Sequence, residues 1–286
     1  MRILILGGKG NLGNQLNKVY KNTKNEIISW SKEDIDITDK GLIDKKIDDL
    51  KPGIIINTAA YNAVDKCQES EEEFLKAKKI NGDAVGYLAD ASVRNKILLV
   101  HYSTDYVFDG KQIEGYREAD APSPINKYGK SKLLGEKELI SRSSKGLKFY
   151  LIRTSKLFGP KGESKTSKPS FFDIMLELAE HKDSLDIVNE EVSCFTYTPD
   201  LAKTTKELIE SDKGYGIYHI VNGGACTWYE ATQELFKQAN VDIRVNPVKS
   251  EIFSRPAKRP KYSVLLNTKL LELRSWQEAL REYLNK

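Results

Sequence analysis

A tyrosine and a lysine near the middle of the chain are spaced for joint chemistry. Tyr128 and Lys132 stand four residues apart in a helical pattern, so a phenol and an ammonium share one helix face. A nearby ammonium stabilises a phenolate and lowers the pKa of the phenol, which suits proton transfer near neutral pH. Ser-Thr-Asp at 103–105 follows the apolar segment 96–101, and the Thr104 hydroxyl either joins this pair or only caps the strand end. We therefore predict a proton-transfer site around these side chains.

The first residues have the pattern of a nucleotide-binding unit. Residues 2–6 form a short apolar run, as in a strand buried on both faces, and a helical pattern begins at Leu12. The glycines between them allow a tight turn and a close approach of the backbone to a pyrophosphate. Their G-x-x-G-x-x-G spacing is not that of the commonest dehydrogenases, and a plain strand-to-helix turn is the alternative. We expect cofactor contacts from Gly7, Gly10, Asn11, Leu12 and Gly13.

The second strand, residues 26–30, ends without the acidic residue that NAD-preferring sites place there. Ser31 and Lys32 follow, a hydroxyl and a cation that suit a 2′-phosphate, although a surface lysine needs no such role. We predict NADPH as the cofactor, with NADH as the alternative. The other residues expected at the cofactor are Asp36 and Ile37 near the adenine, Ala59, Ala60 and Tyr61 after the third strand, and Tyr102, Tyr128 and Lys132.

Strands and helices alternate along most of the chain, which predicts an α/β fold with a doubly wound parallel Rossmann sheet and a smaller substrate-binding lobe. Further strands are expected at 53–57, 96–101, 147–153, 185–188 and 217–221, and helices at 69–93, 171–179, 200–209, 227–238 and 276–283, with another near Leu270. The polar segment 161–168 is expected as a surface loop. Residues 1–155 and about 185–222 would form the cofactor domain, and about 156–184 and 223–286 the smaller lobe.

The composition is that of an ordinary globular protein. Among 286 residues, 45 basic and 41 acidic side chains leave a net charge of +4 with no basic block, which argues against nucleic-acid binding. Three cysteines and three histidines lack metal-ligand spacing, which favours free thiols in a reducing compartment. No apolar run approaches the ~20 residues of a membrane helix, and the first strand leaves no room for a signal peptide. We expect a cytoplasmic protein without nucleic-acid or membrane partners.

With these residues in view, the chain resembles the extended short-chain dehydrogenase/reductases, and among them the dTDP-4-dehydrorhamnose reductases. The resemblance covers nearly the whole length and rests on GGKGNLG, NTAAYNAVDK, HYSTDYVFDG, NKYGKSKLLGE, LIRTSKLFG, GIYHIVNGGACTWYE and RPAKRPKYSVL. It implies that Thr104, Tyr128 and Lys132 are the catalytic group. It also implies that NAD(P)H reduces the 4-keto group of a nucleotide-linked 4-keto-6-deoxyhexose, most closely dTDP-4-dehydro-L-rhamnose, and it allows a homodimer.

The chain departs from the family in the residues expected around the sugar. Lys156 replaces the tryptophan of the usual Arg-Thr-Ser-Trp motif, and Ser170 replaces a common asparagine. Gln15 stands where some members have a magnesium-binding glutamate, so no metal site is carried over. Lys156 either meets a polar group of the substrate or turns to solvent while Tyr106 or Phe195 supplies an apolar wall. The substrate-binding residues we expect are Thr104, Asp105, Tyr106 and Lys156.

Three other functions occur on this kind of fold. A sugar-nucleotide 4,6-dehydratase needs an acid and a base directly after the threonine, and Tyr106 cannot be that base. A sugar-nucleotide epimerase would use the same tyrosine and is separated from a reductase only by the family resemblance. A non-catalytic NADP-binding regulatory subunit would be free to lose Tyr128 and Lys132, and both are present. Reduction is the favoured function.

Overall fold

A six-stranded parallel sheet forms the centre of the computed structural model, which describes residues 1–164 and 167–285. The strand order is β10-β5-β4-β3-β1-β2, so the chain reverses its direction of winding between β1 and β3. In such sheets ligands bind outside the carboxyl ends of the strands at this reversal. The predicted doubly wound parallel sheet is confirmed. Its strands are β1 Arg2–Leu6, β2 Glu26–Trp30, β3 Ile54–Asn57, β4 Leu98–Thr104, β5 Phe149–Thr154 and β10 Gly216–His219.

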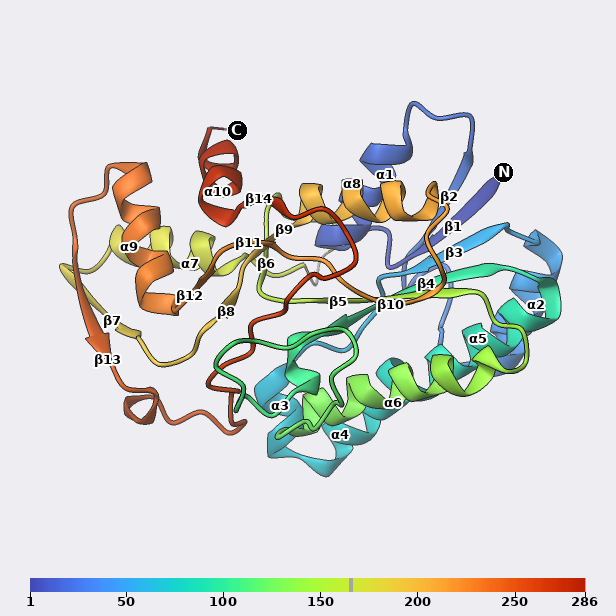
Figure 1. Cartoon of the computed structure of the whole chain (residues 1–286), viewed down its shortest axis with the longest axis horizontal. Coiled ribbons are helices and arrows are strands. Elements are labelled where there is room, and N and C mark those ends of the chain that lie inside the picture. Colours follow the sequence, from blue (N-terminus) through green and yellow to red (C-terminus); the bar gives the residue numbers. More distant parts are fainter. Residues whose placement is uncertain (165–166, 286) are drawn as a thin grey trace.

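Helices cover both faces of this sheet (Figure 1). Side chains alternate across a strand, so Ile3 and Ile5 pack in one apolar core while Leu4 and Leu6 pack in another. The first core lies against α1 and α8, and the second lies against α2, α5 and α6. The continuous aliphatic run of β1 is therefore explained by burial on both faces. These helices are α1 Asn11–Tyr20, α2 Lys40–Leu50, α5 Ala84–Asn95, α6 Lys127–Ser143 and α8 Thr198–Ile209.

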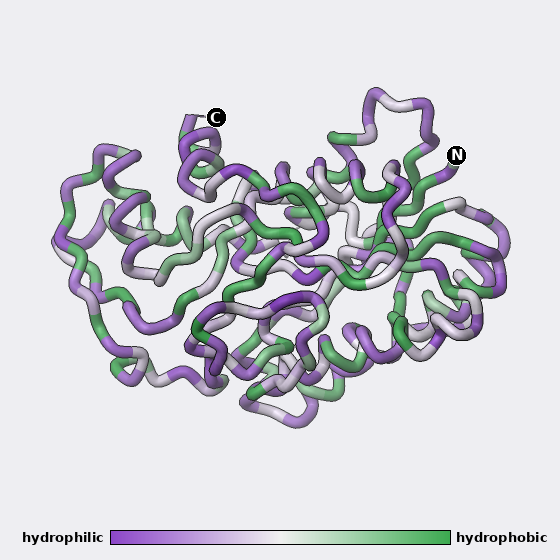
Figure 2. Tube along the Cα trace, viewed as in Figure 1, coloured by the Kyte–Doolittle hydropathy of each residue, from purple (hydrophilic) through white to green (hydrophobic). Residues whose placement is uncertain are grey.

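A smaller lobe with its own aromatic core lies beside the sheet, at the left of Figure 1. Phe172, Phe195 and Trp276 stack within it, with ring centroids 4.9 to 6.2 Å apart. Figure 2 shows hydrophobic segments along the central strands and hydrophilic ones on the outer turns. The elements of this lobe are α7 Phe171–Ala179, β7 Ser184–Val188, α9 Trp228–Ala239, β13 Arg244–Val248 and α10 Trp276–Leu284.

Short elements complete the chain. The helical stretch expected over residues 69–93 divides into two helices, α4 Glu71–Lys78 and α5, which are joined by a π-helical turn, Lys79–Asp83. Among the described residues, no helix is both long and apolar enough to span a membrane. Helix α3 spans Val64–Glu69, and the remaining strands are β6 Leu157–Phe158, β8 Ser193–Cys194, β9 Thr196–Tyr197, β11 Asn222–Gly223, β12 Ala225–Cys226 and β14 Leu273–Ser275.

Two predicted elements are placed differently from expectation. Residues 185–188 do form a strand, but it pairs with β13 because Leu185 and Ile187 face the aromatic core of the smaller lobe. Assigning this strand to the cofactor domain was therefore wrong, while the other domain boundaries stay a prediction. No helix forms near Leu270, where the Asn267 side chain accepts hydrogen bonds from two following amides and holds a turn. Residues 165 and 166 of the expected surface loop lie outside the described residues.

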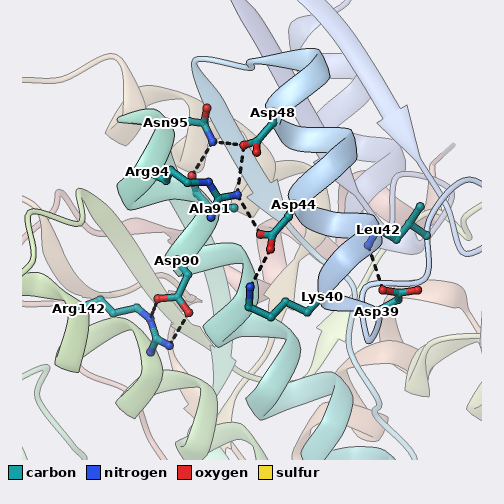
Figure 3. A network of polar contacts seen from close by, with 10 residues as sticks. All are labelled: Asp39, Lys40, Leu42, Asp44, Asp48, Asp90, Ala91, Arg94, Asn95 and Arg142. Carbon is teal, nitrogen blue, oxygen red and sulfur yellow. Dashed lines mark hydrogen bonds and ion pairs between the residues drawn. The ribbon is translucent and has the colours of Figure 1, made fainter.

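Ionic contacts join the outer helices on the α2, α5 and α6 face (Figure 3). Arg94 of α5 donates to Asp44 and Asp48 of α2, at 2.9 and 3.2 Å. Arg142 of α6 donates to both carboxylate oxygens of Asp90 on α5, at 2.6 and 3.0 Å, and its side chain is 15% exposed. The paired geometry and partial burial make the Arg142 contact stronger than an ordinary surface pair.

We predict that Arg142→Met lowers the free energy of unfolding by about 1–2 kcal/mol, because two charge-assisted hydrogen bonds are lost at a partly exposed position. Urea denaturation measures this loss. The matched control is Lys203→Met, whose ion pair with Glu207 spans 3.9 Å in solvent and should change stability by less than ~0.5 kcal/mol. Equal changes in the two variants would contradict the role given to the Arg142 contact.

Candidate active site

Asn126 fixes the start of α6 and so the position of the catalytic candidates. Its side chain accepts a hydrogen bond from the Gly129 amide at 2.7 Å and donates to the Lys258 carbonyl at 2.8 Å. The first contact satisfies an amide in the first turn, which otherwise has no partner in the helix. Tyr128 then lies in that first turn, with Lys132 one turn later. Asn126 was not among the residues predicted from the sequence, although asparagine before a helical pattern is a known start signal.

Thr104 and Tyr128, two of the expected catalytic residues, lie near each other at the end of β4. Thr104 is the last residue of β4, and Tyr128 lies in the first turn of α6. Burial and the neighbouring Asp105 carboxylate raise the pKa of Tyr128 above its ordinary value. The phenol therefore keeps its proton at neutral pH. The expected lowering of this pKa is wrong, because burial and a like-signed neighbour dominate here.

Lys132 is buried beneath this pair and binds the backbone of β4. Its Nζ donates to the Tyr102 carbonyl at 2.6 Å. Burial lowers the pKa of Lys132 to about 8, although the Glu136 carboxylate opposes the shift. The Tyr102 side chain points away from this contact, because its hydroxyl donates to Thr205 of α8 at 2.8 Å in the opposite core. Only the carbonyl of Tyr102 is thus available beside Lys132.

A buried ion pair holds α6 against the sheet one turn beyond Lys132. Arg153 of β5 donates to both carboxylate oxygens of Glu136, at 3.0 and 2.7 Å, and the two side chains are 1% and 0% exposed. Ser103 of β4 adds a third hydrogen bond to Glu136 at 2.5 Å. Tyr128, Lys132 and Glu136 recur every four residues, so one stripe of α6 faces the strand ends. Glu136 was not among the residues predicted from the sequence.

The close approach of α6 to the turn after β4 depends on Gly129. A Cβ at this position would lie 2.1 Å from the Tyr106 carbonyl oxygen, a distance that no side chain tolerates. The absence of a side chain lets the helix approach the residues that follow Thr104. In consequence the Tyr106 and Tyr128 rings meet edge to face, with centroids 6.0 Å apart.

The glycine loop after β1 has the shape that a dinucleotide requires. Gly7 has a φ of +75°, and a Cβ there would lie 2.9 Å from the Ala59 amide at the end of β3. A Cβ at Gly13 would lie 2.3 Å from the Gly7 carbonyl oxygen, so this glycine lets α1 pack on the loop. Gly10 caps α1 without a side-chain hydrogen bond, which leaves first-turn amides for a phosphate. These residues fit a bound NAD(P).

The polar segment after residue 160 lies on the glycine loop. The Gly162 amide donates to Asn11 Oδ1 at 2.9 Å, and the Ser164 amide donates to the Lys9 carbonyl at 2.9 Å. Asn11 Nδ2 in turn donates to the Lys168 carbonyl at 3.1 Å. Asn11 therefore holds this segment through its side chain, in addition to its expected backbone role at the cofactor.

Of the four residues expected around the adenosine, two are buried and two are exposed. Ser31 is buried after β2, but its hydroxyl donates to the carboxylates of Glu33 and Asp34, so a 2′-phosphate would meet negative charge there. Lys32 is exposed nearby. Asp36 is exposed and accepts from Thr38, whereas Ile37 is buried in the core. The prediction of a 2′-phosphate site rested on the hydroxyl and the cation and left out the two acids that follow them.

The residues after β3 connect the cofactor loop to α6. Ala59 packs against the core, and Ala60 is exposed. The Tyr61 backbone exchanges two hydrogen bonds of 2.9 Å with the Asn81 side chain, which also donates to Ser131 of α6. The Tyr61 hydroxyl donates to Glu73 of α4.

Lys156 and Asp105 place a buried amine and a buried carboxyl group next to Thr104, and burial raises the pKa of Asp105. Asp105 is 3% exposed and accepts hydrogen bonds from Ser263 at 2.6 Å and from Thr104 at 3.0 Å. The Lys156 ammonium is buried over the Trp228 ring, 3.7 Å from its centroid, and burial lowers the pKa of Lys156 to about 8. The expectation that Lys156 turns to solvent is therefore wrong, because its ammonium is buried.

The assembled groups can donate a proton to an oxygen at the end of β4. Tyr128 is a protonated phenol, and Thr104 is a second hydroxyl at the same point. Lys132 contributes a positive charge beside them below about pH 8. With a hydride donor bound on the glycine loop, this arrangement suits reduction of a carbonyl.

Comparison with known proteins agrees with this geometry. The family model described as RmlD substrate binding domain matches residues 1–286. The chain is 38% identical over 287 residues to the spore coat polysaccharide biosynthesis protein SpsK of Bacillus subtilis, covering 99% of this chain and 96% of that protein. A crystal structure of a dTDP-4-dehydrorhamnose reductase from Clostridium acetobutylicum is 38% identical with a TM-score of 0.91, covering 100% and 99% of the two chains. A Bacillus anthracis dTDP-4-dehydrorhamnose reductase in complex with NADP is 34% identical with a TM-score of 0.90, covering 99% and 98%.

We predict that Gly129→Ala lowers kcat at least about 10-fold, because the clash with the Tyr106 carbonyl must move Tyr128 away from Thr104. Steady-state kinetics measures the loss, and NADPH affinity serves as a second readout that should change little. The control is Gly214→Ala, where a Cβ meets nothing within 4 Å. Full activity of the Gly129 variant would contradict the close-approach argument.

We predict that Lys156→Met raises the free energy of unfolding at pH 7 by about 1 kcal/mol. Lowering the Lys156 pKa from 10.5 to about 8 costs roughly 3 kcal/mol, and the ring contact returns up to about 2 kcal/mol. The wild-type protein should gain stability as pH rises from 8 to 10.5, because over that range the unfolded chain keeps a proton that the folded protein has released. The advantage of the variant should therefore shrink, as urea denaturation at several pH values would show. An advantage that grows with pH would contradict this account.

Proposed function

Because the chain belongs to the RmlD substrate-binding domain family, we propose that it is an NADPH-dependent reductase of sugar nucleotides. It reduces the 4-keto group of a nucleotide-linked 4-keto-6-deoxyhexose, with dTDP-4-dehydro-L-rhamnose as substrate and dTDP-L-rhamnose as product. The observation that carries this proposal is the grouping of Thr104, Tyr128 and the buried Lys132 at the end of β4, within a chain that matches the family along its whole length. The similarity to a reductase in complex with NADP supports the choice of cofactor.

The roles of the side chains follow from their contacts. NADPH, when bound, supplies a hydride, and Gly7, Gly10 and the amides of Asn11 and Leu12 would hold its pyrophosphate. Tyr128 gives its proton to the carbonyl oxygen as negative charge develops on it. The Thr104 hydroxyl donates to Asp105 in the free protein and turns to donate to the same oxygen when the substrate is bound, which stabilises the charge.

Lys132 and Asp105 adjust the charge around that proton transfer. The Lys132 ammonium offsets the negative charge that Tyr128 acquires once its proton has left. Burial of the phenol, together with Asp105 when that residue is ionised, has the opposite effect and keeps Tyr128 protonated before the reaction. The two effects together favour a phenol that holds its proton until an alkoxide forms.

The cysteines indicate the compartment in which the enzyme works. The buried free thiols of Cys67, Cys194 and Cys226 suit a reducing compartment, so we place the enzyme in the cytoplasm. A homodimer stays a prediction, to be tested by sedimentation.

A regulatory subunit would consume no NADPH. An epimerase would return the hydride and likewise consume none, so net oxidation of NADPH separates reduction from both alternatives.

We predict that Tyr128→Phe lowers kcat by about 10²–10⁴, the usual contribution of general acid catalysis. NADPH affinity should stay nearly unchanged, because the phenol acts on the substrate oxygen. NADPH oxidation after addition of dTDP-4-dehydro-L-rhamnose measures the rate, and fluorescence titration measures the affinity. Turnover equal to wild type would remove Tyr128 from the mechanism.

A further inference from the structure

Lys156 lies at the edge of the sheet where the catalytic candidates meet. Thr154 at the end of β5 is in register with Thr104 at the end of β4, so the residues that follow the two strands lie side by side. Lys156 has a φ of +39°, a left-handed conformation that a residue other than glycine seldom adopts. Such strain is typically found where a side chain must be held in a defined place.

The Lys156 ammonium is enclosed but incompletely satisfied. Its Nζ is buried and has no hydrogen-bond partner within the structure. Its neighbours are the rings of Trp228, at 3.7 Å, and Phe195, at 5.0 Å. Trp228 cannot easily move aside, because its indole nitrogen donates to Glu191 at 3.0 Å, and Glu191 is in turn held by Arg255. An ammonium has three protons to donate, and rings alone cannot accept them as an oxygen does.

Asp105, which follows Thr104 at the end of β4, is an acidic side chain that acts on Lys156. Asp105 attracts the Lys156 charge, but the two do not form an ion pair among the described contacts. Asp105 Oδ1 lies 3.0 Å from Thr104 Oγ1, the hydroxyl that would meet the reacting carbonyl. This spacing is comparable with that of oxygens on neighbouring carbons of a sugar ring.

We propose that Lys156 and Asp105 together bind the substrate hydroxyl on C3, next to the carbonyl that is reduced. A hydroxyl can accept from the ammonium and donate to the carboxylate at the same time, which neither a methyl group nor a ketone can do. The other neighbour of the carbonyl, C5, carries no hydroxyl in a 6-deoxyhexose. This assignment rests on the proposed function and adds to it a residue that determines which sugars are accepted.

The test combines a substitution in the protein with a change in the sugar substrate. Initial rates of NADPH oxidation are measured with dTDP-4-dehydro-L-rhamnose and with its 3-deoxy analogue. For the wild-type protein, loss of the hydroxyl should lower kcat/KM about 10- to 100-fold, as expected for a hydrogen bond to a charged group. For Lys156→Met, the ratio of kcat/KM between the two sugars should fall to about 3-fold or less, while NADPH still binds with wild-type affinity.

A matched control keeps the comparison specific. Lys148 stands at the opposite end of β5, with its ammonium 5.8 Å from the centroid of the Tyr215 ring. Lys148→Met should keep the wild-type ratio between the two sugars. If Lys156→Met fails to bind NADPH, Lys156→Gln is measured instead. Its ratio of kcat/KM between the two sugars should fall between the wild-type ratio and the ratio of about 3-fold or less expected for Lys156→Met.

The possible failures are distinguishable. Equal kcat/KM for the two sugars in the wild type, or an unchanged ratio in the Lys156 variants, overturns the assignment of the C3 hydroxyl and leaves the proposed function standing. No oxidation of NADPH with either sugar contradicts the proposed function itself, and the assignment falls with it.

Discussion

The buried ion pair between Glu136 and Arg153 is the contact on which the arrangement of the site depends. It joins α6 to β5, and the hydrogen bond from Ser103 adds β4 to the same cluster. Two charges removed from water repay the desolvation only when the geometry is good and the remaining positions are satisfied. Here both Glu136 oxygens are bonded, and the Arg153 guanidinium also lies over the Phe108 ring at 5.0 Å. Removing one partner would leave an uncompensated charge and release the helix that carries Tyr128.

With α6 held in this way, the chemistry follows from where charges are buried. Lys132 and Lys156 each lie in surroundings that make their charged form costly. Neither ammonium is placed in an ion pair among the described contacts, so neither is explained by stability. Buried charges that lower stability are expected where a protein has retained them for function. The same burial keeps the Tyr128 phenol protonated, which a proton donor requires.

The sequence predicted those features that depend on local patterns. Aliphatic runs identified the strands of the sheet, and the four-residue spacing placed Tyr128 and Lys132 on one face. It did not predict contacts between distant segments. Whether residues 185–188 join the central sheet depends on which core Leu185 and Ile187 face, and that core is built by residues far along the chain. The raised pKa of Tyr128 likewise results from burial and from Asp105, neither of which a helical spacing can reveal.

The central claim is that a hydride passes from the cofactor to C4 of a nucleotide-linked sugar, and isotope transfer tests it most directly. NADPH carrying deuterium at nicotinamide C4, in the transferable position, is incubated with the protein and dTDP-4-dehydro-L-rhamnose, and the product is analysed by NMR and mass spectrometry. We expect one deuterium in each product molecule, at C4 of the sugar. A sugar product with hydrogen at C4 and no deuterium, or no product while the cofactor stays bound, would contradict it.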